Sequence, residues 1–214
     1  MQFLIANWKS HKTIGDAVEW MNIFTSFSLS SLSPELKIVV CPTFPLLAPI
    51  VNIAQNHLIK LGSQDISQFS VGAHTGEVSG ENLSGLVEYV IIGHSERRIN
   101  NKESEESVRN KINQAKSFSI EPIVCINANT NTNYDTNIIV FEPVSSIGSG
   151  HVDSRQHVID FKSSLKKQYQ HFLYGGSVTV ENAKNYLERR IVDGLLVGAN
   201  SLDPLSFFSI AKQF

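Results

Sequence analysis

Short apolar runs recur along the whole chain and are separated by longer segments of mixed polarity. The runs predict eight strands, at residues 3–5, 38–41, 59–61, 89–92, 123–126, 138–141, 172–174 and 194–197. Residues 138–141 are apolar without a break, which is typical of a strand covered on both faces in a parallel sheet.

Helical periodicity follows most of these strands. Apolar residues repeat at helical spacing in four segments: Ile14, Ala17, Val18 and Met21; Val108, Ile112 and Ala115; Val158, Phe161 and Leu165; and Ala183, Tyr186 and Leu187. A last helix begins at Asp203-Pro204, an N-cap acid followed by proline at the first helical position. The alternation of strand and helix predicts a closed parallel (β/α)8 barrel, formed by residues 1–214 as a single domain.

An open, doubly wound sheet is the alternative fold. Such a sheet normally has fewer strands and a glycine-rich nucleotide-binding loop after the first one. Here the first strand runs into Asn7 and Lys9 without a glycine, which favours the barrel.

The segment 127–137, NANTNTNYDTN, interrupts the pattern because it lies between two strands and has no apolar stripe. A parallel crossover that includes its helix usually needs at least about 10 to 12 residues. We therefore expect a reduced or missing helix between strands five and six and a thin barrel wall there. The serine-rich stretch 26–33 predicts a connector, and neither segment marks a domain boundary.

Composition narrows the class of protein. A hydrophobic content of 42% can form a sizeable core, and 18 basic against 20 acidic residues give a formal net charge of −2. There is no extended basic block, so we expect no nucleic-acid partner. Neither a signal peptide nor a membrane span is predicted, and we expect a cytoplasmic protein that makes no membrane contact.

The cysteines and histidines do not suggest a metal site. Cys41 and Cys125 each close an apolar run, which suits buried thiols better than a disulfide or metal ligands. The seven histidines show no paired metal spacing. We expect no bound metal.

Reactive side chains gather at the predicted strand ends, where barrels of this kind place their active sites. They are Asn7 and Lys9 after the first strand, His94, Ser95 and Glu96 after the fourth, and Glu142 after the sixth. A carboxylate base, an imidazole and an ammonium are the groups that proton abstraction next to a carbonyl needs. Taken singly, each would more often be a surface charge or a structural histidine, so the hypothesis depends on their convergence.

Two small-residue turns and a glycine-containing loop are suited to phosphate binding. Gly175-Gly176-Ser177 and Gly198-Ala199 follow the seventh and eighth strands, where barrels often build a phosphate site from backbone N–H groups. The loop after Glu142 contains Gly148 and Gly150, whose backbone freedom suits a mobile lid.

These residues lie in motifs that resemble the triosephosphate isomerase family over essentially the whole chain. The motifs are NWK at 7–9, GAHTGE at 72–77, GHSERR at 93–98, EPV at 142–144 with IGSG at 147–150, YGGS at 174–177 and LVG at 196–198. GHSERR and the EPV-IGSG loop together are highly specific. The resemblance implies a TIM barrel that interconverts D-glyceraldehyde 3-phosphate and dihydroxyacetone phosphate through an enediolate, in glycolysis and gluconeogenesis. It also implies that no metal or organic cofactor is needed.

The resemblance further implies a role for each catalytic residue. Glu142 is expected to move a proton between the two carbons, while His94, kept neutral as is known for this family, polarises the carbonyl. Lys9 is expected to balance the charge of phosphate and enediolate. Asn7 is expected to donate a hydrogen bond to the substrate oxygens.

Other residues have supporting roles by the same resemblance. Glu96 is expected to orient the catalytic lysine, and Ser95 to be the partner of the base before the lid closes. Thr75 is expected to reach into the active site of a partner subunit, near Asn7 and His94. A homodimer is therefore the minimum assembly that the resemblance implies.

Phosphate is expected to lie against the N–H groups of Gly148, Ser177, Gly198 and Ala199. A lid is expected to close over it and shut out water. The lid residues that the resemblance assigns are Pro143, Val144, Ser145, Ile147, Ser149 and Gly150.

The chain departs from the family at several positions. It is shorter than the roughly 250 residues typical of the fold, and the missing length falls largely at 127–137. Ser145 stands where the usual lid has tryptophan, and Ala199 replaces the second glycine of the last phosphate turn. Asn127-Ala128 replaces a Gly-Glu pair, which removes a supporting acid.

Two other functions stay open. One is a phosphate-binding barrel enzyme that acts on a larger sugar phosphate, although a lid so close to Glu142 leaves little room beyond three carbons. The other is a catalytically silent barrel that serves as a phosphate-ligand binding or assembly module, although the reactive set is complete. We also hypothesise a tetramer, in which a further subunit covers apolar surface exposed by the thin wall at 127–137.

Overall fold

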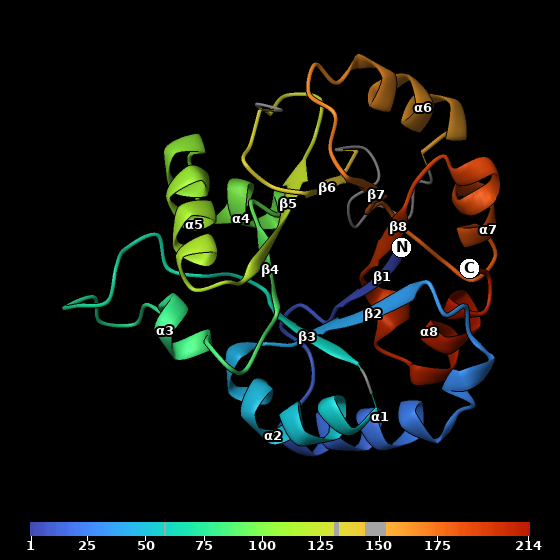
Figure 1. The fold of residues 1–214 in the computed structure, drawn as a ribbon, viewed down its shortest axis with the longest axis horizontal. Helices are drawn as coiled ribbons and strands as arrows, with labels where there is room; N and C mark the ends of the chain where they lie inside the picture. The colour runs from blue at the N-terminus through green and yellow to red at the C-terminus, as the bar shows by residue number, and fades with distance from the viewer. Residues whose placement is uncertain (58, 131–132, 144–152) are drawn as a thin grey trace.

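The computed structural model describes residues 1–57, 59–130, 133–143 and 153–214. Its strands form one closed barrel in which each pairs with its neighbours in chain order (Figure 1). The strands are β1 (Gln2–Asn7), β2 (Leu36–Cys41), β3 (Lys60–Ser63), β4 (Tyr89–Ile92), β5 (Glu121–Ile126), β6 (Ile138–Phe141), β7 (His171–Tyr174) and β8 (Gly194–Val197). The eight predicted strands and the closed (β/α)8 barrel are confirmed.

Every strand pair is parallel, so the C-terminal strand ends meet at one mouth of the barrel. Asn7 at the end of β1 pairs with Cys41 at the end of β2, and Phe141 at the end of β6 pairs with Tyr174 at the end of β7. This register brings Asn7 and Glu142 to the same rim, although 135 residues separate them in the sequence.

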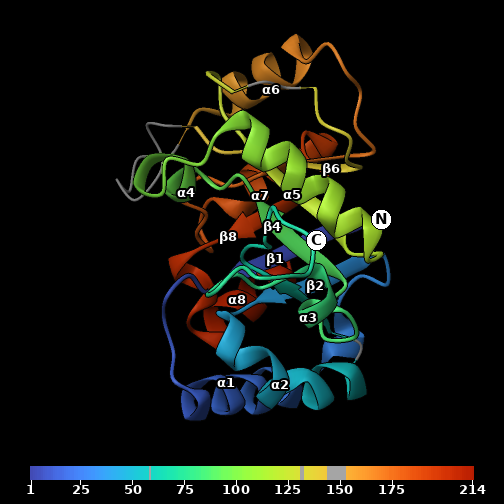
Figure 2. The ribbon, with the colours of Figure 1, turned by 90° about the vertical axis from the view of Figure 1, so that its left-hand side faces the viewer.

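Helices surround the barrel, with α1 and α2 on one side and α6 on the opposite side (Figure 2). The helices are α1 (Ile14–Ser26), α2 (Phe44–Asn56), α3 (Gly80–Leu83), α4 (Ser95–Asn100), α5 (Glu105–Ser117), α6 (Arg155–Ser164), α7 (Ala183–Leu187) and α8 (Pro204–Ala211). Short 3-10 turns are η1 (Leu29–Ser31), η3 (Glu188–Arg190) and η4 (Ala199–Ser201). None of the described helices is long and apolar enough to span a membrane.

The helix start predicted at Asp203-Pro204 has the expected cap. The Asp203 carboxylate accepts a hydrogen bond from the N–H of Ser206, with Pro204 in the first turn. At α1, Thr13 and Asp16 form a reciprocal capping box. These local bonds satisfy N–H groups that have no partner within the helix.

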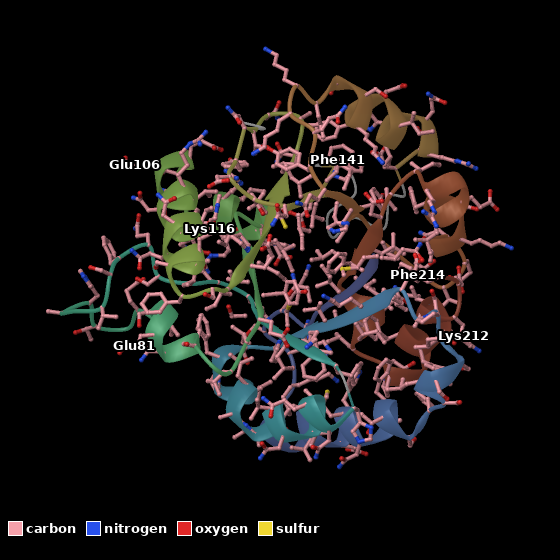
Figure 3. The ribbon with its side chains drawn as sticks, in the orientation of Figure 1. Glu81, Glu106, Lys116, Phe141, Lys212 and Phe214 are labelled. Atoms are coloured by element: carbon pink, nitrogen blue, oxygen red, sulfur yellow. The ribbon has the colours of Figure 1, made fainter. Side chains whose placement is uncertain are left out.

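Strand side chains alternate between two apolar environments. Phe3, Ile5, Cys41 and Cys125 belong to the cluster that fills the barrel interior. Side chains of the other parity face the helices. Phe141, which is labelled in Figure 3, is one of them, and its ring stacks on that of Phe161 of α6 with centroids 3.8 Å apart. Both cysteines are free and buried, as predicted.

The linker between β5 and β6 has no helix in its described residues, 127–130 and 133–137, as predicted, and it passes between α5 and α6 (Figure 1). A single turn closes with a hydrogen bond from the N–H of Thr130 to the carbonyl of Asn127 at 3.1 Å. Tyr134 is fully buried. The expectation of exposed apolar strand surface at this wall is wrong for the described residues, because the apolar residues of β5 and β6 are buried as well.

The loop after β3, residues 64–79, projects away from the barrel (Figure 1). Phe69 and Val71 on this loop are 43% and 55% exposed. The Phe69 ring stacks on the His74 ring with centroids 4.5 Å apart. The loop therefore has a side-chain contact within itself although it extends from the barrel.

Candidate active site

Glu142 is a buried carboxylate at the mouth of the barrel. It follows β6 directly, and its own N–H donates to the carbonyl of Ile126 at 2.8 Å, which continues the pairing with β5. Its Oε2 accepts a hydrogen bond from the N–H of Ser95 at 3.0 Å. Its Oε1 lies 2.9 Å from Nε2 of His94. Only 2% of the residue is exposed, so its interactions are with protein groups.

Gly175 allows this carboxylate to lie so deep. A Cβ atom on Gly175 would come within 2.7 Å of Cγ1 of Val140 and 3.3 Å of Cγ of Glu142. The YGGS motif therefore does more than form a turn, because its first glycine makes room for the side chain of the predicted base.

His94 is the N-cap of α4, and this fixes the tautomer of its imidazole. Its Nδ1 accepts a hydrogen bond from the N–H of Glu96 at 3.2 Å. A nitrogen that accepts carries no proton, so the N–H of the neutral ring lies on Nε2, which faces Glu142. The position at a helix N-terminus also disfavours a positive charge on this ring.

The two side chains shift each other's protonation. Burial alone would raise the pKa of Glu142, but His94 and the N–H of Ser95 outweigh burial and hold that pKa below its ordinary value. Burial alone would lower the pKa of His94, but the carboxylates of Glu142 and Glu96 together outweigh burial and raise it. A ligand that displaces Glu142 from the ring removes the larger of these two upward influences, which moves the pKa of His94 back toward the neutral imidazole.

Lys9 sits in an unusual backbone conformation, with φ of 51°. Its N–H donates to Oδ1 of the buried Asn7 at 3.1 Å. Gln64 secures the same loop, since its side-chain amide donates to the carbonyls of Lys9 and Cys41, each at 2.9 Å. The left-handed conformation costs a non-glycine residue free energy, of order 1 kcal/mol or more, and these hydrogen bonds hold it in place.

The Lys9 ammonium pairs with Glu96, with Nζ and Oε1 2.5 Å apart. Both side chains are partly exposed, at 32% and 41%, so the pair lies at the open mouth and not in the core. Glu96 thus contacts two residues of the site, because its carboxylate pairs with Lys9 and its N–H donates a hydrogen bond to Nδ1 of His94. This contact is the one that Glu96 would need in order to orient Lys9.

The predicted phosphate turn after β8 lies beside Lys9. A Cβ atom on Gly198 would be 3.9 Å from Nζ of Lys9, which brings the ammonium close to that turn. Ala199 begins η4 and has no positive φ, so its N–H is retained without backbone strain. Ser177 has φ of 35°, and its carbonyl accepts from the side-chain amide of Asn182 at 3.0 Å.

The predicted lid falls mostly outside the described residues. Pro143 is described and buried. The other assigned lid and phosphate residues lie outside the described part of the chain: Val144, Ser145, Ile147, Gly148, Ser149 and Gly150.

A cavity of about 350 Å³ opens beside the candidate catalytic side chains. Its lining includes Asn7, Lys9, His94 and Glu96 together with Gln64 and Arg97. Within the described ranges, no group of three or more His, Cys, Asp or Glu side chains is arranged to hold a metal ion.

Several residues that shape this site were not singled out from the sequence. Gln64 and Asn182 act through hydrogen bonds to backbone carbonyls, and no local pattern marks them. Gly175 was predicted only as part of a phosphate turn, and its steric role beside Glu142 was not. Arg98 is the exception, because it closes the GHSERR motif. Its Nε donates to the carbonyl of Gly93 at 2.8 Å, directly before His94.

The fold and the site together define the class, a (β/α)8-barrel protein whose mouth carries a carboxylate, an imidazole and an ammonium suited to proton transfer. A sequence profile described as triosephosphate isomerase matches residues 2–137 and 127–214. The chain belongs to the triosephosphate isomerase family.

Three relatives named triosephosphate isomerase support this assignment. The protein of Mesomycoplasma hyopneumoniae (strain 7448) is 32% identical over 237 residues, covering 98% of both chains. That of Thermodesulfovibrio yellowstonii is 34% identical over 244 residues, covering 99% of this chain and 98% of the relative. That of Aquifex aeolicus is 32% identical over 247 residues, covering 100% of this chain and 99% of the relative.

The same comparisons mark the linker as the place where this chain differs. The two ranges matched by the family profile share residues 127–137. The alignment with the Aquifex aeolicus protein spans 247 positions, more than the 214 residues of this chain, so the relative carries additional residues. A profile match divided at the linker indicates that much of the missing length lies there.

Proposed function

We propose that this chain is a triose-phosphate isomerase, which interconverts D-glyceraldehyde 3-phosphate and dihydroxyacetone phosphate in glycolysis and gluconeogenesis. The observation that carries the proposal is the contact between Glu142 and Nε2 of His94 at 2.9 Å. A carboxylate base and an imidazole donor are held side by side at the mouth, with the Lys9–Glu96 pair next to them.

The reaction begins when the substrate carbonyl replaces Glu142 as the acceptor of the Nε2–H of His94. The carbonyl is then polarised, and the hydrogen on the neighbouring carbon becomes more acidic. Glu142 loses one of its two hydrogen bonds and becomes a stronger base. It takes the proton from that carbon and returns it to the adjacent carbon of the enediolate. His94 passes a proton between the two enediolate oxygens, so that the carbonyl and the hydroxyl group exchange places.

Lys9 and Asn7 stabilise the negative charge that appears during this transfer. The ammonium of Lys9 lies near the Gly198 turn, so it can balance both the substrate phosphate and the enediolate oxygens. Asn7 donates a hydrogen bond from its amide nitrogen to the oxygens. Phosphate is proposed to lie against the N–H groups of Gly148, Ser177, Gly198 and Ala199, and Ser95 to hold Glu142 until substrate arrives. The proposed roles need no metal or organic cofactor.

We propose a homodimer as the minimum assembly. The exposed apolar residues Phe69 and Val71 on the projecting loop suit burial against a second copy. Thr75 is exposed on the same loop, and the cavity beside Asn7 and His94 offers a place for the Thr75 of a partner. Residues 1–214 are proposed to act as one domain in the cytoplasm.

A coupled assay tests the proposal. Glyceraldehyde 3-phosphate is supplied, and the dihydroxyacetone phosphate formed is reduced by a specific NADH-dependent dehydrogenase. We expect saturable turnover by the purified chain, and ribose 5-phosphate should give none in a parallel isomerase assay. A folded protein that turns over neither substrate would favour the silent binding module, and turnover of the larger sugar phosphate alone would favour the rival enzyme.

A further inference from the structure

The linker between β5 and β6 delivers one buried side chain to the back of the active site. Tyr134 is 0% exposed, and its hydroxyl donates to Oε2 of Glu105 at the start of α5. The same hydroxyl accepts a hydrogen bond from NH2 of Arg98 at 3.0 Å. Arg98 NH1 also pairs with Oε1 of Glu105 at 2.7 Å. Tyrosine, arginine and glutamate therefore form a closed ring of hydrogen bonds.

Arg98 connects this ring of hydrogen bonds to the backbone segment that orients His94. Its Nε donates to the carbonyl of Gly93 at 2.8 Å, and Gly93 has φ of 69°. A Cβ atom on Gly93 would lie 2.8 Å from NH2 of Arg98, so the guanidinium presses directly on this turn. The next residue is His94, whose imidazole depends on the turn for its direction.

Further contacts hold Tyr134 in its position within the linker. Its N–H donates to the Tyr169 hydroxyl at 3.1 Å, and its carbonyl accepts from Nζ of Lys167 at 2.5 Å. The Arg109 guanidinium lies 5.2 Å from the centre of its ring. Burial and the Glu105 carboxylate raise the pKa of Tyr134, so its hydroxyl keeps its proton and can donate and accept at once.

We infer that Tyr134 is a positioning residue for His94, acting through Arg98 and Gly93. The shortened linker thus has a function besides closing the wall, because its Tyr134 engages Arg98 together with Glu105. The catalytic part of this inference rests on the proposed isomerase activity.

The test compares Tyr134→Phe with a control at another contact between the linker and α5. The phenylalanine keeps the ring but removes the hydroxyl, which frees Arg98 from one of its anchors. Small misplacements of a reacting group are costly, up to about 100-fold for 1 Å, and we expect kcat to fall by roughly tenfold with KM within about twofold. Lys116→Ala removes the exposed pair between Lys116 and Asp135, which tethers the same linker to α5, and should leave kcat unchanged.

A coupling measurement separates positioning from general loosening. In an Arg98→Met background, adding Tyr134→Phe should lower kcat by less than about twofold, because both changes interrupt one path. Unchanged kcat in Tyr134→Phe, or equal tenfold losses in both backgrounds, would overturn the inference.

A second readout does not depend on turnover. The ring ¹⁵N signals of His94, assigned with His94→Gln and followed with pH, report its tautomer and pKa. We expect them to change in Tyr134→Phe and to stay unchanged in Lys116→Ala. If the wild-type chain fails the isomerase assay, the proposed function fails alone; unaltered His94 signals in Tyr134→Phe would overturn the positioning role by itself.

Discussion

Glu142 and His94 hydrogen-bond to each other in this structure, so the proposed base and the proposed proton donor are paired before substrate arrives. Their pairing keeps a buried carboxylate ionised, because His94 and the N–H of Ser95 replace the lost water. It also keeps Glu142 a weaker base than it becomes once a substrate carbonyl takes over the Nε2–H. Substrate binding and activation of Glu142 as a base are thereby linked through one group, the Nε2–H of His94.

The pairing predicts how stability depends on pH. The pKa of Glu142 is held below its ordinary value of 4.5 in the folded chain, so the carboxylate stabilises the fold above that value and the contribution is lost as pH falls through the folded pKa. We expect the free energy of unfolding of wild type to decrease between about pH 5 and pH 3, and Glu142→Gln to show a flatter profile.

Urea unfolding at a series of pH values measures both profiles. Glu106→Gln, which removes an exposed carboxylate from α5, serves as the control and should follow wild type. Identical pH profiles for wild type and Glu142→Gln would show that the pair does not stabilise the fold through an ionised Glu142.

At the scale of the elements, the catalytic side chains are placed by strand ends that meet only in three dimensions. Gly175 of the turn after β7 makes room for Glu142 after β6, and Gln64 after β3 secures Lys9 after β1. Each of these contacts joins neighbouring or next-neighbouring strands of the closed barrel.

Substitution of Gly175 by alanine tests this dependence. The new Cβ would approach Val140 to 2.7 Å, and a buried β-branched side chain has little freedom to move. We expect a loss of about 1–3 kcal/mol in stability and a lower kcat, because Glu142 is displaced. Thermal unfolding and the isomerase assay measure the two effects.

Gly15→Ala is the matched control for that variant. A Cβ atom on Gly15 would meet only Oγ1 of Thr13, at 3.8 Å, and alanine favours the helix by up to about 1 kcal/mol. Its stability should be equal to wild type or higher. If Gly175→Ala were as stable and as active as Gly15→Ala, the steric account of Glu142 would be wrong.

The sequence predicted the strands well because each is a buried apolar run, and β4, β6 and β8 form at the predicted residues. Helix α2 was missed because Pro45 and Pro49 weaken its helical signal, and α4 because GHSERR was interpreted as a strand end. The catalytic residues could be found through motifs. Gln64 and Tyr134 could not, since their partners are distant in the sequence and only the closed barrel brings them together.

At the scale of the whole molecule, the projecting loop after β3 has no role that a single subunit explains. It exposes Phe69 and Val71, and in the proposed dimer it reaches the cavity beside the partner's catalytic residues. Activity and assembly are then connected, because loss of the partner would leave Asn7 and Lys9 more open to solvent.

Thr75→Arg should weaken the proposed dimer, because a large charged side chain would have to enter the cavity of the partner. We expect light scattering to report a smaller mass than for wild type, together with reduced specific activity. Glu81→Arg introduces the same side chain at an exposed position on α3 and should change neither. A Thr75→Arg protein with wild-type mass and activity would contradict the proposed role of this loop.

The most direct test of the central claim follows the proton itself. Glyceraldehyde 3-phosphate is converted in heavy water, and NMR locates deuterium in the dihydroxyacetone phosphate formed. With wild type we expect solvent deuterium at one of the two positions on the hydroxymethyl carbon next to the carbonyl, and Glu142→Gln should slow the reaction by roughly 10² to 10⁴, the usual contribution of a positioned base. A Glu142→Gln rate within a few-fold of wild type, or solvent deuterium at the carbon that bears the phosphate, would contradict proton transfer by Glu142.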